Sequence, residues 1–451
     1  TLHSNLELVE PLTELIYRKT SGNPFFVNEF LKTIYQENLL KFDWQQRCWV
    51  WDIPQIDALS ITENVVDLLI DKLKKIPDAP QQALLLAACI GNSFDLKTLS
   101  IVYEKSLTDT FVDLLPTIQS GLIQPTSSLE TTSNNPIDSS LIILNYNFQH
   151  DRVQQAAYAL IDENDKETVH LKIGRLLLTN TLPDELEENI FAIVDHLNKG
   201  KNLIAGKAEK VQLSQLNLKA GKKAKEATAY TAAKEYFISA KFFFTGNIWK
   251  GKNNYKMAMD LYKNLAQVEY LTSNFQESEL LIELAINRAK SALERSEFYY
   301  LLIELYTMQG KYLEAIEVGR TALAQLGIDF PDGDFNKAVE AELGKFSEIL
   351  GNREVASLID NPEMEDPIKQ MALELLIKML PPSYLGAPQI AGVVMAKSAN
   401  LSVEYGHTSK SAISYGIFGM LQAMLGNYQL SYQLTLLGYQ LSKKFDDLYS
   451  I

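Results

Sequence analysis

A histidine and an arginine stand two residues apart at the expected start of a helix, within the stretch 148–158. His150 and Arg152 both carry N–H groups that can donate hydrogen bonds to an anion such as a phosphate. Helical spacing of apolar residues predicts that this helix covers 151–160, directly after a strand-like run over 141–148. In the alternative interpretation His150 only caps the helix or is buried at its start, and Arg152 is an ordinary exposed arginine.

A second group of residues, Ser21-Gly22-Asn23-Pro24, interrupts two segments with apolar residues at helical spacing. These residue types favour a turn. Pro24 lies where the second helix is expected to begin, the position that proline tolerates best. Aromatic-rich runs over 40–44 and 48–51 then predict a β-hairpin around 45–47.

The remaining residues with reactive side chains show no spacing typical of a phosphate-binding, metal-binding or catalytic site. No G-x-x-x-x-G-K-[ST] loop occurs, so the segment cannot hold a triphosphate by itself. His170 and His196 lie in expected amphipathic helices, and neither the histidines nor Cys48 and Cys89 have metal-ligand spacing. Nothing resembles a nucleophile elbow or a kinase catalytic loop. We therefore predict no catalytic residue and no metal site.

The region before His150 is predicted to contain helices followed by a strand, a loop and a second strand. This is the order of elements in a winged helix. Ser60 or Thr62 can cap the first of these helices. The expected helices cover 62–73, 81–90, 94–103 and 108–119, and strands over 121–124 and 141–148 flank a polar loop over 126–140. DNA binding is not expected, because the helix that would enter the major groove contains Asp109 and Asp113 but no Lys or Arg.

From about residue 170 onward every strong segment is helical, and small and aromatic residues recur as in stacked helix pairs. Aromatic residues expected to begin second helices step from Tyr230 to Phe275 to Tyr312, and Tyr428 follows 116 residues later, about three further units. Tetratricopeptide units have about 34 residues, so this array is degenerate. The residues expected at tight helix–helix seams are Gly221, Ala224, Tyr306 and Gly419 in first helices and Ala233, Ala315 and Ser431 in second helices. The alternative is an irregular helical domain.

Composition excludes some classes of partner. The chain has 451 residues and a net charge of −14, which disfavours nucleic acid and anionic membranes. Two cysteines make no disulfide framework, and no apolar run approaches the roughly 18 residues that span a bilayer. We therefore expect no nucleic-acid partner, no membrane insertion and a cytoplasmic location. Both ends look cut, as in an internal piece of a larger protein.

Four stretches in this order resemble the middle of large cyanobacterial-type signalling kinases. They are YRKTSGNPFF (17–26), LAACIGNSF (86–94), FQHDRVQQAAY (148–158) and HLKIG (170–174). Such proteins carry a serine/threonine kinase domain, a predicted ATPase of the STAND class, helical repeats, and then GAF and often histidine-kinase modules. The resemblance extends over nearly the whole chain, but the kinase domain, the Walker motifs and the carboxyl-terminal modules are absent from this sequence.

The resemblance implies a mainly α fold in three parts. Residues 1–57 would form the carboxyl-terminal helical lid of a STAND or AAA-like ATPase, with its β-hairpin. Residues 58–163 would form a winged helix with a small β wing. Residues 164–451 would form a tetratricopeptide-like α-α superhelix, truncated at its carboxyl end.

The resemblance also implies roles for Pro24, His150 and Arg152. In STAND proteins the proline of the lid lies against the adenine ring, and a winged-helix histidine reaches the β-phosphate of ADP; Arg152 could assist. Such a charge-assisted hydrogen bond contributes about 1.5–3 kcal/mol. ADP or ATP would belong to the full-length parent, whose core site lies outside this chain, and the isolated fragment would hold no cofactor.

The function implied is regulatory, in a parent that is a serine/threonine or histidine protein kinase with an ATPase domain. The segment would couple a nucleotide switch to protein partners of the repeats and to other domains of the same polypeptide. Two alternatives stay open. The segment could be a protein-interaction scaffold without a functional switch, or the same module in a transcription activator or nucleotide cyclase.

Overall fold

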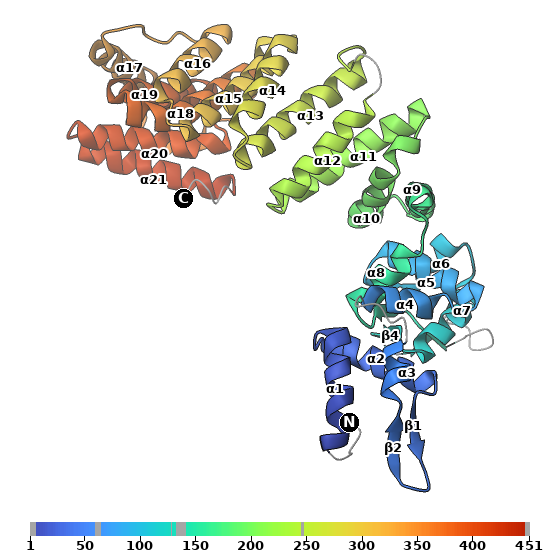
Figure 1. Ribbon diagram of the computed structural model, residues 1–451. Helices are drawn as coiled ribbons and strands as arrows, with labels where there is room; N and C mark the ends of the chain where they lie inside the picture. The colour runs from blue at the N-terminus through green and yellow to red at the C-terminus, as the bar shows by residue number, and fades with distance from the viewer. Residues whose placement is uncertain (1–5, 59–64, 128, 132–140, 245–247, 447–451) are drawn as a thin grey trace. The chain divides into compact units, whose positions relative to one another are not determined.

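The computed structural model describes residues 6–58, 65–127, 129–131, 141–244 and 248–446 (Figure 1). The chain divides into two compact units, Thr1–Gly206 and Lys207–Ile451, which are described separately here. Helices dominate both units, so the predicted mainly α fold is confirmed. The predicted caps Ser60 and Thr62 and most of the predicted loop over 126–140 lie outside the described residues.

The first unit begins with three helices and a hairpin. Its elements are α1 (Leu6–Thr20), α2 (Pro24–Gln36), β1 (Leu40–Asp43), β2 (Cys48–Trp51) and α3 (Ile53–Ala58). Asn23 caps α2 by accepting the backbone N–H of Phe26, and Pro24 lies in the first turn of that helix. The two strands pair antiparallel, as the sequence predicts. Leu12, Phe30, Ile34 and Ile56 belong to a small core shared by these elements, which we call the amino-terminal core.

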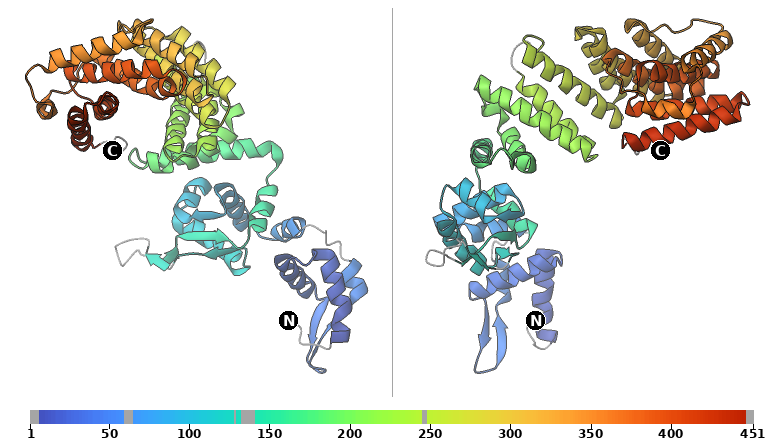
Figure 2. Two further views of the ribbon diagram at one scale, coloured as in Figure 1. Left: turned by 90° about the vertical axis from the view of Figure 1, so that its left-hand side faces the viewer. Right: turned by 180° about the vertical axis from the view of Figure 1, so that it is seen from behind.

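A second group of helices encloses a small sheet. The elements are α4 (Val65–Leu73), α5 (Asp78–Ile90), β3 (Ser93–Asp95), α6 (Leu96–Tyr103), α7 (Leu107–Gln119), β4 (Ile123–Pro125), β5 (Leu129–Thr131), β6 (Leu141–Ile143), β7 (Asn145–Phe148) and α8 (Asp151–Ala159). The main sheet has the order β3-β7-β4 with antiparallel pairs, and β5 and β6 form a separate hairpin (Figure 2). This order of elements matches the one that the sequence predicts for a winged helix.

Three details of this region differ from the sequence prediction. Residues 93–95 form β3, although the expected helix was to begin at Phe94. Strand β5 lies within the expected loop, and the strand expected over 141–148 is divided into β6 and β7. Strands of three or four residues are too short to show a clear alternation of apolar and polar side chains.

The first unit ends with α9 (Glu163–Asn180), α10 (Leu186–Lys199) and η1 (Lys201–Leu203). A Cβ at Gly174 would lie 2.6 Å from the side chain of Leu197, so the missing side chain lets α9 and α10 pack closely. Helix α9 also packs on α6. Helix α9 begins at the predicted domain boundary, and the prediction therefore assigns both helices to the part of the chain that contains the repeats. The division into three domains itself stays a prediction.

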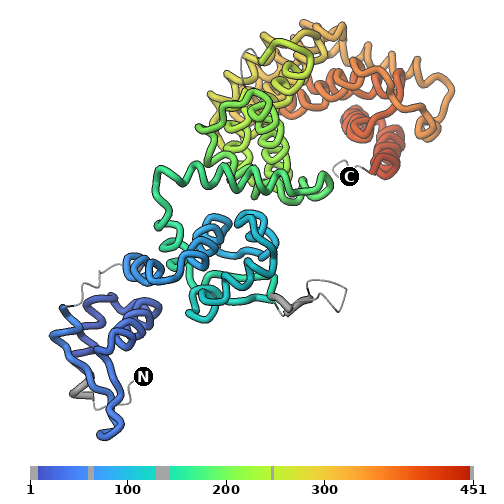
Figure 3. The backbone as a smooth tube through the Cα atoms, turned by 90° about the vertical axis from the view of Figure 1, so that its right-hand side faces the viewer, coloured from blue at the N-terminus to red at the C-terminus, as the bar shows by residue number. Residues whose placement is uncertain are grey.

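The second unit is a row of helix pairs. Its elements are α11 (Lys207–Glu226), α12 (Tyr230–Phe243), α13 (Lys252–Leu271), α14 (Phe275–Arg288), α15 (Ala292–Met308), α16 (Tyr312–Gln325), α17 (Phe335–Leu350), η2 (Val355–Asp360), α18 (Pro367–Gly386), α19 (Pro388–Tyr405), α20 (Ser409–Met424) and α21 (Tyr428–Lys444). Within the described residues the pairs are α11–α12, α13–α14, α15–α16, α18–α19 and α20–α21 (Figure 3). Tyr230, Phe275, Tyr312 and Tyr428 each begin a second helix, as predicted.

The prediction of about three units between Tyr312 and Tyr428 is wrong. That interval holds two pairs and an insertion, α17 with η2, which follows α16. Helix α17 packs on α19, and η2 packs on α21, so the insertion covers second helices. The inserted helix is amphipathic like its neighbours, and residue spacing alone therefore could not distinguish it from a repeat.

The predicted seams are largely confirmed. A Cβ at Gly221 would lie 2.4 Å from Phe237, and one at Gly419 would lie 2.7 Å from the Thr435 hydroxyl oxygen. Ala233 and Ala315 are fully buried. Ser431 also lies at its predicted seam, since a Cβ at Gly419 would lie 3.1 Å from the Ser431 backbone oxygen, although the residue is only half-buried.

The row of pairs curves toward its first helices. Successive first helices contact one another, from α11 to α13, α15, α18 and α20. Among the residues that the structure describes, successive second helices make no comparable contacts. We call the inner side of this curve the first-helix face.

Candidate functional site

The candidate site begins with the cap of α8. His150 has an extended backbone and lies exposed at the N-cap, where its ring Nδ1 accepts the backbone N–H of Arg152 at 3.1 Å. A neutral imidazole has one donor nitrogen and one acceptor nitrogen. Because Nδ1 is the acceptor, the neutral ring carries its proton on Nε2. The Nε2–H group is therefore the donor that His150 can offer to a ligand.

The amino-terminal end of α2 meets this cap. The ring of Phe25 stacks on the imidazole of His150, with 4.3 Å between ring centroids and 18° between planes. Phe25 is half-buried and follows Pro24, which is exposed at the first turn of α2. The stack therefore brings the segment that contains Pro24 beside the residue that caps α8.

The charges around the cap are mixed. Arg152 is exposed, and its Nη1 donates a hydrogen bond to the side-chain oxygen of Gln155 at 2.9 Å, along α8. The positive end of the α8 dipole, the His150 Nε2–H and the remaining Arg152 donors favour an anion. The carboxylate of Asp151, also in the first turn, opposes one. The balance is that of a weak anion site that needs further donors.

Two buried groups connect α2 to the helices α4 to α8. Phe26 belongs to the core formed by these helices, which we call the α4–α8 core. The buried carboxylate of Glu29 accepts hydrogen bonds from Lys72 of α4 at 2.7 Å and from Lys32 at 2.8 Å. Burial raises the pKa of Glu29, but the two lysines outweigh it, and its pKa lies below the usual value.

The structure thus brings Pro24 and His150 to adjoining surfaces, while the Arg152 side chain is turned toward Gln155. Sequence reasoning missed Phe25 and Glu29. Phe25 could have been found as the neighbour of Pro24. Glu29 carries a clearer signal, because a lone acid within an apolar helical stripe (Phe26, Phe30) must be paired when it is buried.

A second cluster lies beyond the other end of α8. The hydroxyl of Tyr158 is 2.9 Å from Nε2 of His170, and Nδ1 of His170 is 2.8 Å from Nδ1 of His196. Burial, with smaller contributions from Lys199 and Lys166, lowers the pKa of His170 to about 4. Burial, the neighbouring His170 and Lys199 lower the pKa of His196 to about 3.

This buried pair was not expected from the sequence, because the histidines lie 26 residues apart on different helices. Both rings are nearly inaccessible to solvent. In the part of the chain that the structure describes, no third His, Cys, Asp or Glu completes a metal-binding group with them. The pair therefore links α9 to α10 and, through Tyr158, to the end of α8.

Comparison with known proteins finds no family model that matches the chain. The chain is 28% identical to "Hybrid signal transduction histidine kinase G" of Dictyostelium discoideum, over 99% of this chain and 15% of that protein. It is 21% identical to "Peroxide stress-activated histidine kinase mak3" of Schizosaccharomyces pombe, over 64% of this chain and 12% of that protein. The chain is thus similar to a segment of much longer signal-transduction histidine kinases and spans less than a sixth of their length.

A solved structure gives a remote likeness. It is the crystal structure of a STAND protein with a tetratricopeptide repeat sensor from Pyrococcus horikoshii, with 12% identity and a TM-score of 0.34. The match covers 95% of this chain and 61% of that one. None of the helices described here is both long enough and apolar enough to span a membrane.

Proposed function

We propose that this chain is a regulatory segment of a multi-domain signal-transduction kinase. The lid and the winged-helix region form one face of a nucleotide switch whose phosphate-binding core lies elsewhere in the same polypeptide. ADP bound to that core is contacted by Pro24 at its adenine ring and by His150 at its β-phosphate, with Arg152 beside it. The helix pairs of the second unit bind a protein partner that controls the switch.

The observation that carries this proposal is the Phe25–His150 stack. It supports a shared ligand because it joins the exposed Pro24 segment to an exposed histidine with a donor nitrogen that has no partner among the described residues. The similarity to long histidine kinases, together with the curved row of helix pairs, supports a signalling role. A row of this kind offers an extended surface to a polypeptide.

The test uses the full-length parent with His150→Ser. Serine is a good N-cap, so this substitution keeps the cap of α8 and removes the ring. We expect ADP to be retained about 5- to 20-fold less tightly and basal kinase output to rise, since one charge-assisted hydrogen bond of the closed state is lost. Retention is measured as the dissociation rate of labelled ADP.

The matched control is Gln149→Ser, one residue before the cap, which should leave ADP dissociation unchanged. Phe25→Leu should give an intermediate result, because the ring that orients His150 is lost while the imidazole remains. Unchanged ADP dissociation in His150→Ser would refute the sensor role and leave the interaction scaffold as the better description.

A further inference from the structure

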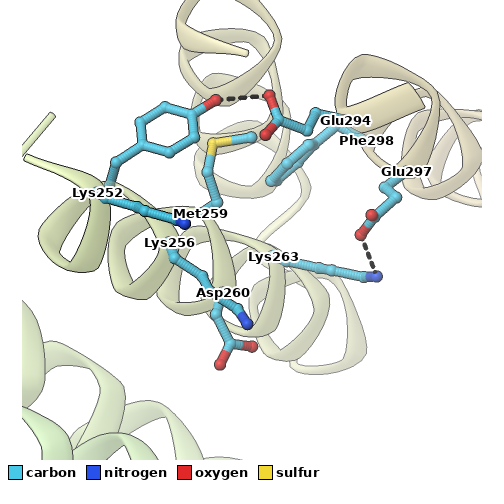
Figure 4. A pocket seen from close by; sticks show the side chains of 9 residues that line it. Lys252, Lys256, Met259, Asp260, Lys263, Glu294, Glu297 and Phe298 are labelled. Atoms are coloured by element: carbon cyan, nitrogen blue, oxygen red, sulfur yellow. Dashed lines mark hydrogen bonds and ion pairs between the residues drawn. The ribbon is translucent and has the colours of Figure 1, made fainter. Parts of the chain in front are cut away.

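A pocket of about 570 Å³ lies between two consecutive first helices of the second unit (Figure 4). Helix α13 contributes the first six lining residues and α15 the other three: Lys252, Tyr255, Lys256, Met259, Asp260, Lys263, Glu294, Glu297 and Phe298. Both are first helices of their pairs, so the pocket opens on the first-helix face. Its volume is in the range of specific ligand sites.

Every acidic side chain of the pocket already has a partner. Glu297 pairs with Lys263 at 2.7 Å, and Asp260 pairs with Lys222 of α11. Glu294 accepts the Tyr255 hydroxyl at 2.7 Å and the backbone N–H of Lys290 at 2.8 Å. Hydrogen bonds from these donors outweigh the effect of burial, and the pKa of Glu294 lies below its usual value, so this carboxylate stays ionised.

Two lysines of the pocket have no such partner. Lys252 and Lys256 are exposed on successive turns of α13, and neither has an ion pair with any residue that the structure describes. Lys252 also lies in the first turn of α13, where the helix dipole favours negative charge. Lys222 and Lys263 offset Asp260 and Glu297, whereas Glu294 keeps its negative charge because its partners are a hydroxyl and a backbone N–H. The pocket together with Lys222 therefore carries four positive and three negative charges, and its two unpaired lysines both lie on α13, in a chain whose net charge is −14.

The base of the pocket is apolar. Phe298 is buried, Tyr255 is nearly so, and Met259 is half-buried beside them. Figure 4 shows Met259 of α13 and Phe298 of α15 pointing toward one another inside the pocket, apart from the ion pair of Lys263 with Glu297. A thioether and aromatic rings accept an aliphatic side chain without a hydrogen-bond penalty.

We propose that this pocket binds an extended acidic peptide segment, with an aliphatic side chain against Met259 and Phe298 and two carboxylates at Lys252 and Lys256. Residues one helical turn apart are separated by about 6 Å, and alternate residues of an extended peptide by about 7 Å. An extended segment can also follow the first-helix face along neighbouring pairs. This inference rests on the proposed function, which assigns a protein partner to the repeats, and it adds the chemistry of that partner.

The experiment measures fluorescence anisotropy with the 451-residue chain and a labelled peptide that has leucine residues alternating with aspartates. We expect saturable binding that weakens at high salt, because the Debye length falls from about 10 Å at 0.1 M to about 3 Å at 1 M. Lys252→Glu/Lys256→Glu should weaken binding at least about tenfold. The matched control is Lys41→Glu/Lys337→Glu, which makes the same change in net charge at two exposed lysines outside the pocket and should bind as the unmodified chain does.

Three results would overturn the proposal. The first is equal binding of a peptide in which asparagines replace the aspartates. The second is an affinity unaffected by the Lys252→Glu/Lys256→Glu change. The third is a phosphoserine peptide that binds more than about tenfold tighter than the aspartate peptide, which would assign the pocket to a phosphorylated partner. None of these results depends on ADP retention in the parent, so failure here is distinct from failure of the nucleotide switch.

Discussion

At the amino end of α8 the imidazole of His150 is exposed, whereas beyond its carboxyl end the imidazoles of His170 and His196 are buried. The first ring uses one nitrogen to cap a helix, and its other nitrogen has no hydrogen-bond partner among the described residues. The buried rings bond to each other, and His170 also bonds to Tyr158. One short helix thus separates a histidine suited to binding from a pair suited to holding helices together.

The contrast shows that exposure and hydrogen bonding, rather than residue type, decide what a histidine can do. Burial lowers the pKa of the paired histidines to about 4 and about 3, so both are neutral at pH 7. A neutral pair whose ring nitrogens bond to each other has little capacity left for a ligand. If this division is right, substitutions at the two ends of α8 should affect different properties of the molecule.

The largest effect on stability is expected from His170→Ala. This change leaves the Tyr158 hydroxyl and a His196 nitrogen without their present partner and creates a cavity, which together should lower the free energy of unfolding of the first unit by about 2–4 kcal/mol. Urea unfolding followed by the fluorescence of Trp49 and Trp51, in the hairpin of that unit, measures it. A loss below 0.5 kcal/mol would mean that the pair does not hold α9 and α10 together.

A smaller effect should follow mild acidification. A histidine in the unfolded chain has a pKa of about 6.5. Below that pH the unfolded chain therefore binds protons that the buried pair in the folded chain does not bind. The contribution of the neutral pair to the stability of the fold is complete above about pH 6.5 and is lost progressively toward pH 4. Hydrogen-exchange protection of α9 and α10 should therefore fall between pH 7 and pH 5. Helices α13 and α15, which contain no histidine, are the internal control; an equal fall there would contradict the assignment.

The smallest effect on stability is expected at the exposed end. His150→Ser keeps a capping side chain and loses one ring stack, which contributes about 0.5–1.5 kcal/mol. Thermal unfolding of the 451-residue chain should shift by no more than a few degrees. If this variant were as unstable as His170→Ala, His150 would be a structural residue, and a change in ADP retention could no longer be ascribed to the ligand.

Local signals in the sequence predict much of this fold. The turn before Pro24, the hairpin around 45–47 and the starts of α12, α14, α16 and α21 all follow from proline, glycine and aromatic positions with strong local preferences. The insertion of α17 and η2 could not be predicted in this way. Its helix has the same periodicity as a repeat helix, and only its packing on α19 identifies it as an addition.

The candidate site was predictable in part. His150 and Pro24 stand out because each lies at a helix start with turn residues before it. The pairing of His170 with His196 and the free charge of Lys252 and Lys256 depend on which side chains of other helices lie nearby. A sequence gives the positions of charged residues, but the neutralisation of Asp260 and Glu297 by Lys222 and Lys263 appears only in three dimensions.

Helix α2 contributes to two cores, with Phe30 and Ile34 in the amino-terminal core and Phe26 in the α4–α8 core. Separating α2 from the helices α4 to α8 would expose the Phe26 side chain to water, which costs about 1.5–3 kcal/mol of free energy. It would also leave the Glu29 carboxylate without its hydrogen bond from Lys72. A hinge between α2 and these helices would therefore be stiff. If Pro24 contacts a nucleotide as proposed, a displacement of Pro24 would move α2 and the helices α4 to α8 together as one rigid body.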